Sequence, residues 1–106
     1  MPIYLVTYHH GPGLPSDPAV LEQMLAAFQT WVAGVGTAMI DPGAPIGAAK
    51  TVSADGAVDG QQEATIGGYT LLEAASLDDA VALLRGHPYL SGGGALQVNE
   101  SVSVGP

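Results

Sequence analysis

One stretch governs the second half of this 106-residue chain, and it reads Gly67-Gly68-Tyr69-Thr70-Leu71-Leu72-Glu73, then Ser76-Leu77-Asp78-Asp79-Ala80-Val81, then His87-Pro88-Tyr89-Leu90-Ser91-Gly92-Gly93-Gly94. Residues 66–73 predict a strand, and Ser76 begins a helix with Asp79 three residues later, a variant of the capping box. Gly86 suits the left-handed position after that helix, and Pro88 prevents its continuation. Residues 95–104 predict the strand that completes a strand–helix–strand unit.

The first third of the chain has the same order. Residues 3–8 are β-branched and aromatic, which predicts a strand buried on both faces. Asp17 suits the N-cap of a helix whose first position is Pro18, and Gly34 and Gly36 mark its end. Apolar residues at spacings of three and four predict that this helix is one wall of the core: Leu21, Met24, Leu25, Phe28, Trp31, Val32 and Val35.

A short strand and a hairpin connect the two halves. Residues 37–40 predict the strand, and Asp41-Pro42-Gly43-Ala44-Pro45 should close it, because proline cannot donate into a ladder and glycine suits a turn. Asp55-Gly56 lies between the alternating runs of residues 51–58, which is the usual signal for a two-residue hairpin turn. We interpret residues 51–58 as a small flap.

The order β-α-β, hairpin, β-α-β predicts one α+β domain over residues 1–106 with a ferredoxin-like fold. Two helices would cover one face of a four-stranded antiparallel sheet. Only 11% of the residues are charged and 47% are apolar. We therefore expect a second subunit to cover the other face, in a homodimer or a higher oligomer.

The charge and composition exclude several functions. The net charge is −8 and the cations are Lys50 and Arg85, too few to bind nucleic acid or a polyanionic substrate. Without cysteine, the chain has no disulfide, thiolate metal site or cysteine nucleophile. No apolar run approaches the roughly 20 residues of a membrane span, and the start is unlike a signal peptide. We expect a cytoplasmic protein.

Several segments resemble, in their order and spacing, the YCII-related (DGPF-type) domain family: Asp41-Pro42-Gly43-Ala44-Pro45-Ile46-Gly47, Lys50-Thr51-Val52, Asp55-Gly56, Gly68-Tyr69-Thr70-Leu71-Leu72-Glu73-Ala74 and His87-Pro88-Tyr89-Leu90 with Gly93-Gly94. The resemblance covers about residues 3–104. It implies a dimeric α+β barrel with a pocket between sheet and helices. It also implies cofactor-free chemistry on small ring compounds, including dehydrochlorination, with a His/Asp pair as acid and base.

Two departures from the family pattern bear on that mechanism. The YciI-like branch has a histidine on its first helix, whereas residues 18–35 contain none. That branch also commonly has Asp where this chain has His87, before the same Pro-Tyr. The carboxylate–imidazole pair is therefore not transferred intact.

His87 is the leading catalytic candidate, since an imidazole in a loop can take and return a proton near neutral pH. The alternative is that it bonds the carbonyls at the helix end. Asp41 could be its partner or could form an Asx turn. Glu73 shares a strand face with Tyr69 and Leu71, where it would be an acid if buried or a solvated edge residue if exposed.

Aromatic residues supply the expected binding groups. Tyr4, Tyr8, Tyr69 and Tyr89 could line a pocket with their hydroxyls or simply pack, and Trp31 could line it or belong to the core. His9 and His10 are adjacent on an extended chain, so they should point apart and not chelate one metal together. We therefore expect no metal site.

The sequence thus predicts a cofactor-free acid/base enzyme acting on a small, mostly apolar ring compound such as a phenol, quinone or lactone. His87 would shuttle the proton, with Asp41 or Glu73 as partner. One alternative is a non-catalytic module that binds a small molecule or dimerises. Another is chemistry like that of the tautomerases, with the amine of Pro2 as base after removal of Met1.

Overall fold

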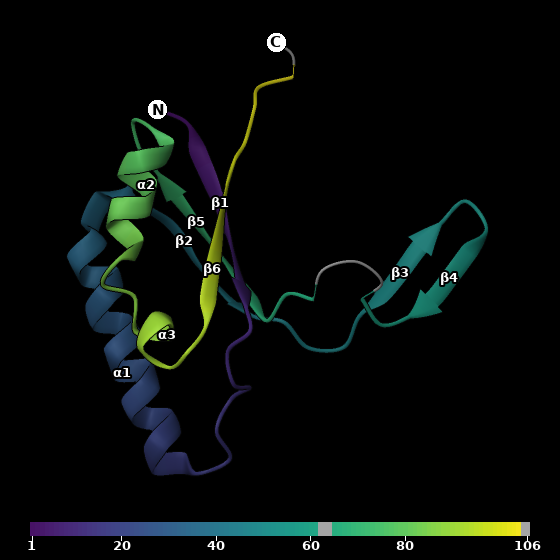
Figure 1. Ribbon diagram of the computed structural model, residues 1–106, viewed down its shortest axis with the longest axis horizontal. Coiled ribbons are helices and arrows are strands. Elements are labelled where there is room, and N and C mark those ends of the chain that lie inside the picture. Colours follow the sequence, from purple (N-terminus) through teal and green to yellow (C-terminus); the bar gives the residue numbers. More distant parts are fainter. Residues whose placement is uncertain (62–64, 105–106) are drawn as a thin grey trace.

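Four antiparallel strands in the order β2-β5-β1-β6 form the central sheet of the computed structural model, which describes residues 1–61 and 65–104. Its strands are β1 (Ile3–His9), β2 (Met39–Pro45), β5 (Gly68–Glu73) and β6 (Ala95–Glu100). The helices α1 (Pro18–Val35) and α2 (Leu77–Leu84) cover one face of it (Figure 1). The remaining elements are the turns η1 (Gly36–Ala38) and α3 (Pro88–Ser91) and a separate hairpin of β3 (Lys50–Ser53) and β4 (Gly56–Asp59). The ferredoxin-like α+β prediction is confirmed.

The core lies between the sheet and the two helices. Val6 of β1 and Leu72 of β5 pack with Trp31 of α1 and Leu84 of α2. On the opposite face of β1, Ile3 and Leu5 remain 39% and 38% exposed. The prediction that residues 3–8 are buried on both faces is therefore wrong for the single chain. The strand alternates because only one of its faces has helices to cover it.

The ends of α1 follow the sequence signals. The Asp17 carboxylate accepts a hydrogen bond from the backbone N–H of Ala19 at 2.9 Å, and Gly36 has a positive φ of 69° where the helix stops. The apolar stripe is only partly core. Trp31 is buried, but Met24 and Leu25 are 39% and 51% exposed because the first half of the helix extends past the sheet (Figure 1).

The end of α2 differs from the expectation. Ser76 caps its start by accepting a hydrogen bond from the Asp79 backbone N–H at 3.1 Å, as predicted. Gly86, however, does not have a positive φ. The backbone N–H groups of Arg85 and His87 instead donate three residues back, to Ala82 and Leu84, which tightens the last turn and removes the need for a left-handed residue.

The second strand is longer and lies later in the sequence than predicted. Residues 36–38 form a 3₁₀ turn, and β2 runs through Asp41-Pro42-Gly43-Ala44-Pro45. Its prolines are tolerated because β2 is an edge strand, where an N–H group can be missing without breaking the ladder. The register shifts on both sides of Asp41. Gly43 takes a φ of +77° there, against the backbone of Tyr69.

The predicted hairpin is present, with a shifted turn. Ser53 pairs with Gly56, so the two turn residues are Ala54 and Asp55, one position before the predicted pair. We call residues 50–59 the arm. It projects from the body on the side of the sheet opposite α1 and α2 (Figure 1). Among the other boundaries, β5 begins at residue 68 rather than 66, and β6 ends at residue 100 rather than 104.

In the part of the chain that the structure describes, no helix has both the length and the apolar character needed to cross a bilayer.

We expect Gly43→Ala to destabilise the fold. A Cβ at this position would lie 1.7 Å from the Tyr69 carbonyl oxygen, and φ there is +77°. The left-handed conformation alone costs an L-residue about 1–2 kcal/mol, so unfolding by denaturant should show a loss above that amount. Gly47→Ala is the matched control, since nothing lies within 4 Å of a Cβ there. Equal stability of the two variants would contradict this close approach of β2 to β5.

Candidate functional site

His87 lies in the core, at the junction of α2 and α3. Its side chain is 4% exposed, and its ring centroid lies 4.2 Å from that of Trp31 and 5.6 Å from that of Phe28. His87 is the N-cap of α3, because its Nδ1 accepts a hydrogen bond from the Tyr89 backbone N–H at 3.0 Å. Its Nε2 lies 2.6 Å from the Tyr8 hydroxyl. Both ring nitrogens therefore have partners.

The hydrogen bonds around His87 have one consistent direction. Since Nδ1 accepts, a neutral imidazole carries its hydrogen on Nε2 and donates it to the Tyr8 hydroxyl oxygen. The Thr70 hydroxyl donates to the carbonyl oxygen of Pro42 at 2.8 Å, so it is the Tyr8 hydroxyl that donates to Thr70, at 2.7 Å. A continuous series of hydrogen bonds therefore leads from His87 through Tyr8 and Thr70 to the backbone of β2. We name these groups, His87, Tyr8, Thr70 and the Pro42 carbonyl, the buried chain.

Burial keeps the buried chain uncharged. It lowers the pKa of His87 to about 4, so the imidazole is neutral at pH 7. Burial also raises the pKa of the Tyr8 phenol above its ordinary value, so the phenol keeps its proton. Each donor has an acceptor, which is the condition under which polar groups are stable in a core. At rest, His87 is held in place as a neutral hydrogen-bonding group.

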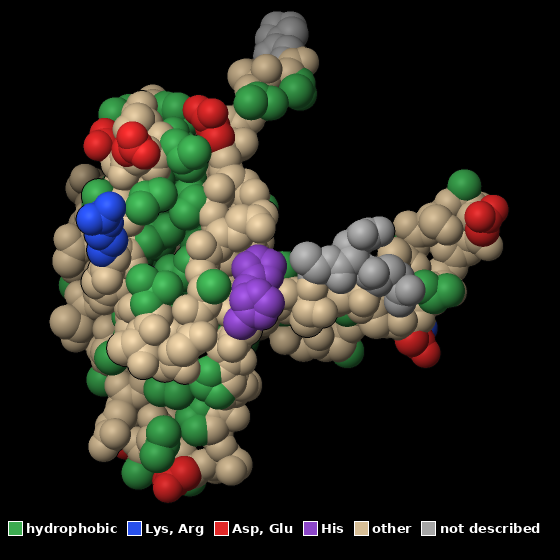
Figure 2. All heavy atoms as spheres, viewed as in Figure 1, with side chains coloured by type: hydrophobic (Ala, Val, Ile, Leu, Met, Phe, Trp, Pro, Cys, Tyr) green, Lys and Arg blue, Asp and Glu red, His purple; other side chains and the backbone are tan. Residues whose placement is uncertain are grey.

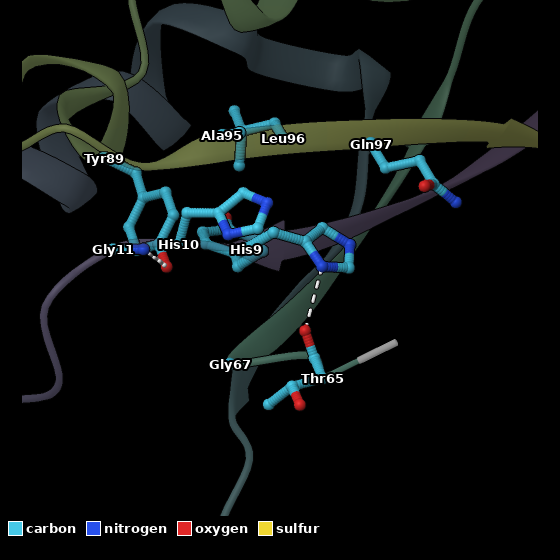
Figure 3. A pocket seen from close by; sticks show the side chains of 10 residues that line it. His9, His10, Gly11, Thr65, Gly67, Tyr89, Ala95, Leu96 and Gln97 are labelled. Carbon is cyan, nitrogen blue, oxygen red and sulfur yellow. Dashed lines mark hydrogen bonds between the residues drawn. The ribbon is translucent and has the colours of Figure 1, made fainter. Parts of the chain in front are cut away.

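A pocket of about 680 Å³ opens beside the buried chain, where β1 ends and β6 begins. Tyr8 belongs to the buried chain and also lines the pocket. The other main lining side chains are His9, His10, Thr65, Tyr89 and Gln97 (Figure 3). Histidine side chains form a patch on the surface where the body meets the segment that leads to the arm (Figure 2). The pocket is open to solvent.

His9 and His10 reach the pocket by different routes. The His9 Nδ1 donates to the Thr65 carbonyl at 2.9 Å, and its Nε2 accepts from the Thr7 hydroxyl at 2.8 Å (Figure 3). His10 leaves the strand with a φ of +63°. The expectation that the two side chains point apart is wrong, because this left-handed residue breaks the alternation of an extended chain. Their ring centroids are 6.1 Å apart.

His10 is the pocket residue whose imidazole is least constrained. None of the residues in ranges 1–61 and 65–104 hydrogen-bonds its ring, and its side chain is exposed. A left-handed φ is uncommon outside glycine, although histidine is one of the residue types in which it is enriched. Residues with such backbones cluster at functional sites. A sequence signal was present, since a His-His pair lies directly between a strand and a Gly-Pro-Gly loop.

Tyr89 stands between the pocket and His87. Its ring lies between two glycines, and an added Cβ would lie 2.3 Å from the ring at Gly11 and 2.2 Å from it at Gly94. The Gly11 backbone N–H donates to the Tyr89 hydroxyl at 3.0 Å (Figure 3). The Tyr8 ring meets the Tyr89 ring edge-on at 4.9 Å. The two phenol rings therefore form a wall with His87 behind it.

The structure places the other candidates away from the pocket. Asp41 accepts a hydrogen bond from the Gly43 backbone N–H at 2.8 Å, which is the Asx-turn alternative. Glu73 is half-buried opposite Ile3, on the sheet face that the helices leave open, together with Tyr69. Trp31 packs in the core and donates to the Leu83 carbonyl at 3.0 Å.

The buried chain contains no carboxylate. The two His87 side-chain hydrogen bonds between described residues go to Tyr8 and the Tyr89 backbone. The same residues contain no cluster of three His, Asp or Glu side chains able to hold a metal ion. Pro2 precedes β1, whereas the pocket lies beyond the other end of that seven-residue strand. At a rise of about 3.3 Å per residue, this separates the Pro2 amine from the pocket by roughly 20 Å.

The fold is similar to that of a solved dehydrochlorinase. This is 5-chloro-2-hydroxyhydroquinone dehydrochlorinase (TftG) from Burkholderia phenoliruptrix AC1100, in complex with 2,5-dihydroxybenzoquinone. The TM-score is 0.52 at 18% identity, over 90% of each chain. No family model matches the chain, and the search of curated proteins returned no match. The comparison therefore supports the fold.

We expect His87 to make the stability of the fold depend on pH. Its pKa is about 4 in the folded chain and 6.5 in the unfolded one, so the unfolded state binds more protons between these values. The free energy of unfolding is thus complete above pH 6.5 and falls as the pH drops towards 4, by at most about 1.4 kcal/mol per pH unit for this one group.

Two variants separate this effect from the titration of carboxylates. His87→Asn keeps an acceptor for the Tyr89 N–H, and His87→Gln keeps a group that reaches Tyr8, yet neither side chain titrates. Denaturant unfolding at pH 7, 6, 5 and 4.5 should give both variants a shallower pH slope than the wild type. An unchanged slope in both would show that His87 is not buried as a neutral imidazole.

Proposed function

We propose that this protein is a cofactor-free enzyme that moves protons on a small, mostly apolar ring compound, such as a phenol, a quinone or a lactone. The observation that carries the proposal is the pocket of about 680 Å³, in which His9 and His10 lie beside Tyr8 and Tyr89. Its volume is in the range typical of sites for small organic molecules. Isomerisation, elimination and oxygenation are the reaction types that such proton transfer would serve.

His10 is the residue to which we assign direct proton transfer. Imidazole is the side chain best suited to accept and return a proton near neutral pH, and none of the described residues occupies its ring nitrogens. The Tyr89 ring offers the substrate an aromatic surface. His9 supports the Thr65 side of the pocket through its hydrogen bond to the carbonyl there.

His87 acts, in this proposal, through Tyr8. Both of its nitrogens are occupied and the pKa lies near 4, so it is a weak base behind the wall of the two phenol rings. It fixes the position and hydrogen-bond direction of Tyr8, which does line the pocket. We assign no contact with the substrate to Asp41, Glu73 or Trp31, which lie outside the lining.

Two observations support the proposed class of substrate, one from a similar fold and one from the charge of this chain. By its name, the dehydrochlorinase that shares the fold acts on a hydroxylated six-membered ring, and it was solved with a dihydroxybenzoquinone bound. In this chain, a net charge of −8 disfavours anionic substrates. A ring compound that is neutral, or that loses its charge on binding, fits both observations.

The test is a thermal-shift screen of hydroxyquinones, phenols, lactones and halogenated analogues, followed by turnover assays. A ligand at 100 times its Kd should stabilise the protein by about 2.7 kcal/mol. We expect His10→Asn to bind the same ligands but to lose about 10²- to 10⁴-fold in kcat. Asparagine suits the left-handed backbone of this position. His87→Asn is the comparison variant and should retain more activity than His10→Asn.

Each result decides between the candidate functions. Loss of kcat in His10→Asn with ligand binding intact supports the proposal. Greater loss in His87→Asn would return the shuttle role to His87. Stabilisation by a ligand with no turnover in the wild type would favour the non-catalytic binding module. No stabilisation by any compound would contradict the small-ring substrate.

A further inference from the structure

Two aromatic side chains of the pocket have no hydrogen left to donate to a ligand. The His9 ring donates to the Thr65 carbonyl at 2.9 Å and accepts from the Thr7 hydroxyl at 2.8 Å. The Tyr8 hydroxyl donates its hydrogen to Thr70 at 2.7 Å. A neutral imidazole has one N–H donor, and a phenol has one O–H donor. The donors of His9 and Tyr8 are therefore both used inside the protein.

Tyr89, by contrast, has a hydroxyl hydrogen that none of the described residues accepts. Its oxygen accepts the Gly11 backbone N–H at 3.0 Å (Figure 3), and a backbone N–H can only donate. The hydroxyl hydrogen thus stays available to a group in the pocket. The ring is held in place, because Gly11 and Gly94 lie so close that an added Cβ at either would overlap it. Tyr89 is a fixed donor in the pocket lining.

Gln97 offers the pocket an acceptor. The side-chain amide of Asn99 donates to the Leu5 carbonyl oxygen at 3.0 Å, and a carbonyl oxygen can only accept. The Asn99 oxygen is therefore the atom that faces Gln97, which donates to it from Nε2 at 2.8 Å. This order of bonds also identifies Oε1 of Gln97, to which no residue in the ranges 1–61 and 65–104 donates. Since Gln97 lines the pocket, Oε1 is the polar atom that it presents to a ligand.

The remaining polar side chains leave this assignment intact. Thr65 points away from the imidazole rings (Figure 3), and His10 is the group to which the proposed function assigns proton transfer. None of the described residues that line the pocket is Asp, Glu, Lys or Arg. Tyr89 and Gln97 are therefore the donor and the acceptor with which the pocket can hold an uncharged ligand.

We propose that Tyr89 and Gln97 determine which ring compounds the pocket accepts. Tyr89 donates to a carbonyl oxygen of the ligand, and Gln97 accepts from one of its hydroxyl groups. These roles rest on the proposed function and narrow its substrates to neutral rings that carry both a carbonyl and a hydroxyl group. A simple phenol offers Tyr89 no carbonyl, and a simple quinone or lactone has no hydrogen for Gln97. Such a ligand displaces water from a polar group without replacing its hydrogen bond, which weakens binding.

Three ligands with the same pair of fused rings test these roles. Hydroxytetralone, with its hydroxyl on the aromatic ring, has both groups, tetralone has the carbonyl alone, and tetrahydronaphthol has the phenol hydroxyl alone. Calorimetric titration gives the Kd of each, at a pH below the pKa of the phenol. We expect hydroxytetralone to bind about tenfold more tightly than either of the others, because one additional hydrogen bond is worth about that factor.

Two variants assign the effect to single side chains. Tyr89→Phe keeps the ring and should weaken hydroxytetralone and tetralone about tenfold, with tetrahydronaphthol unchanged. Gln97→Leu should weaken hydroxytetralone and tetrahydronaphthol by a similar factor, with tetralone unchanged. The matched controls are Tyr69→Phe, which removes a hydroxyl outside the pocket lining, and Gln23→Leu, which removes an exposed amide of α1. Both controls should bind all three ligands like the wild type.

The selective losses expected for each variant support the two roles. Equal affinity of the wild type for all three ligands would overturn them and leave the proposed function standing. An equal loss for all three ligands in a variant would show that its side chain only shapes the pocket, and would overturn the role of that residue. If none of the three ligands binds the wild type, these roles fail together with the small-ring substrate of the proposed function.

Discussion

A single imidazole ties the elements of this fold together. His87 accepts the Tyr89 backbone N–H at the start of α3 and donates to the Tyr8 hydroxyl at the end of β1. Through Thr70 the same chain reaches the Pro42 carbonyl of the edge strand β2. Asparagine or aspartate could cap the helical turn but would not reach Tyr8, and glutamine could reach Tyr8 but would not cap the turn. Imidazole spans both positions, so this residue type is required by the packing whether or not it takes part in chemistry.

The same anchor holds one residue of the pocket lining, Tyr8. Three consecutive residues meet at the pocket with different partners: the Tyr8 hydroxyl bonds His87, the His9 ring bonds the Thr65 carbonyl, and His10 lines the pocket from a left-handed backbone. His9 is held separately, by its hydrogen bonds to Thr65 and Thr7 and by the pairing of its backbone with Ala95. The buried His87 is neutral and fully bonded, whereas the exposed ring of His10 has no hydrogen bond to a described residue, so the proposed roles divide between core and surface.

Sequence reasoning succeeded at the starts of the two helices, where structure is decided locally. Asp17 and Ser76 cap their helices as predicted, because capping involves residues only two or three positions apart. It failed where a distant partner decides. Residues 41–45 contain two prolines and a glycine that read as a turn, yet they form a strand because β5 pairs with them at the edge of the sheet. The candidate residues Tyr8, His87 and Tyr89 were found from their types, but the bond between Tyr8 and His87 joins positions 79 apart and follows only from the fold.

The role of His10 shows a different limit. Alternation along a strand predicts opposite directions for adjacent side chains only while the backbone stays extended. The Gly-Pro-Gly loop after His10 shows that the strand ends nearby, but not at which residue. The low charge content of the chain was more informative. Only 11% of its residues are charged, and the sheet face opposite the helices does expose the apolar residues Ile3 and Leu5. The pocket borders this uncovered face, since His9 follows Ile3, Leu5 and Thr7 along it and Gln97 pairs with Thr7 there.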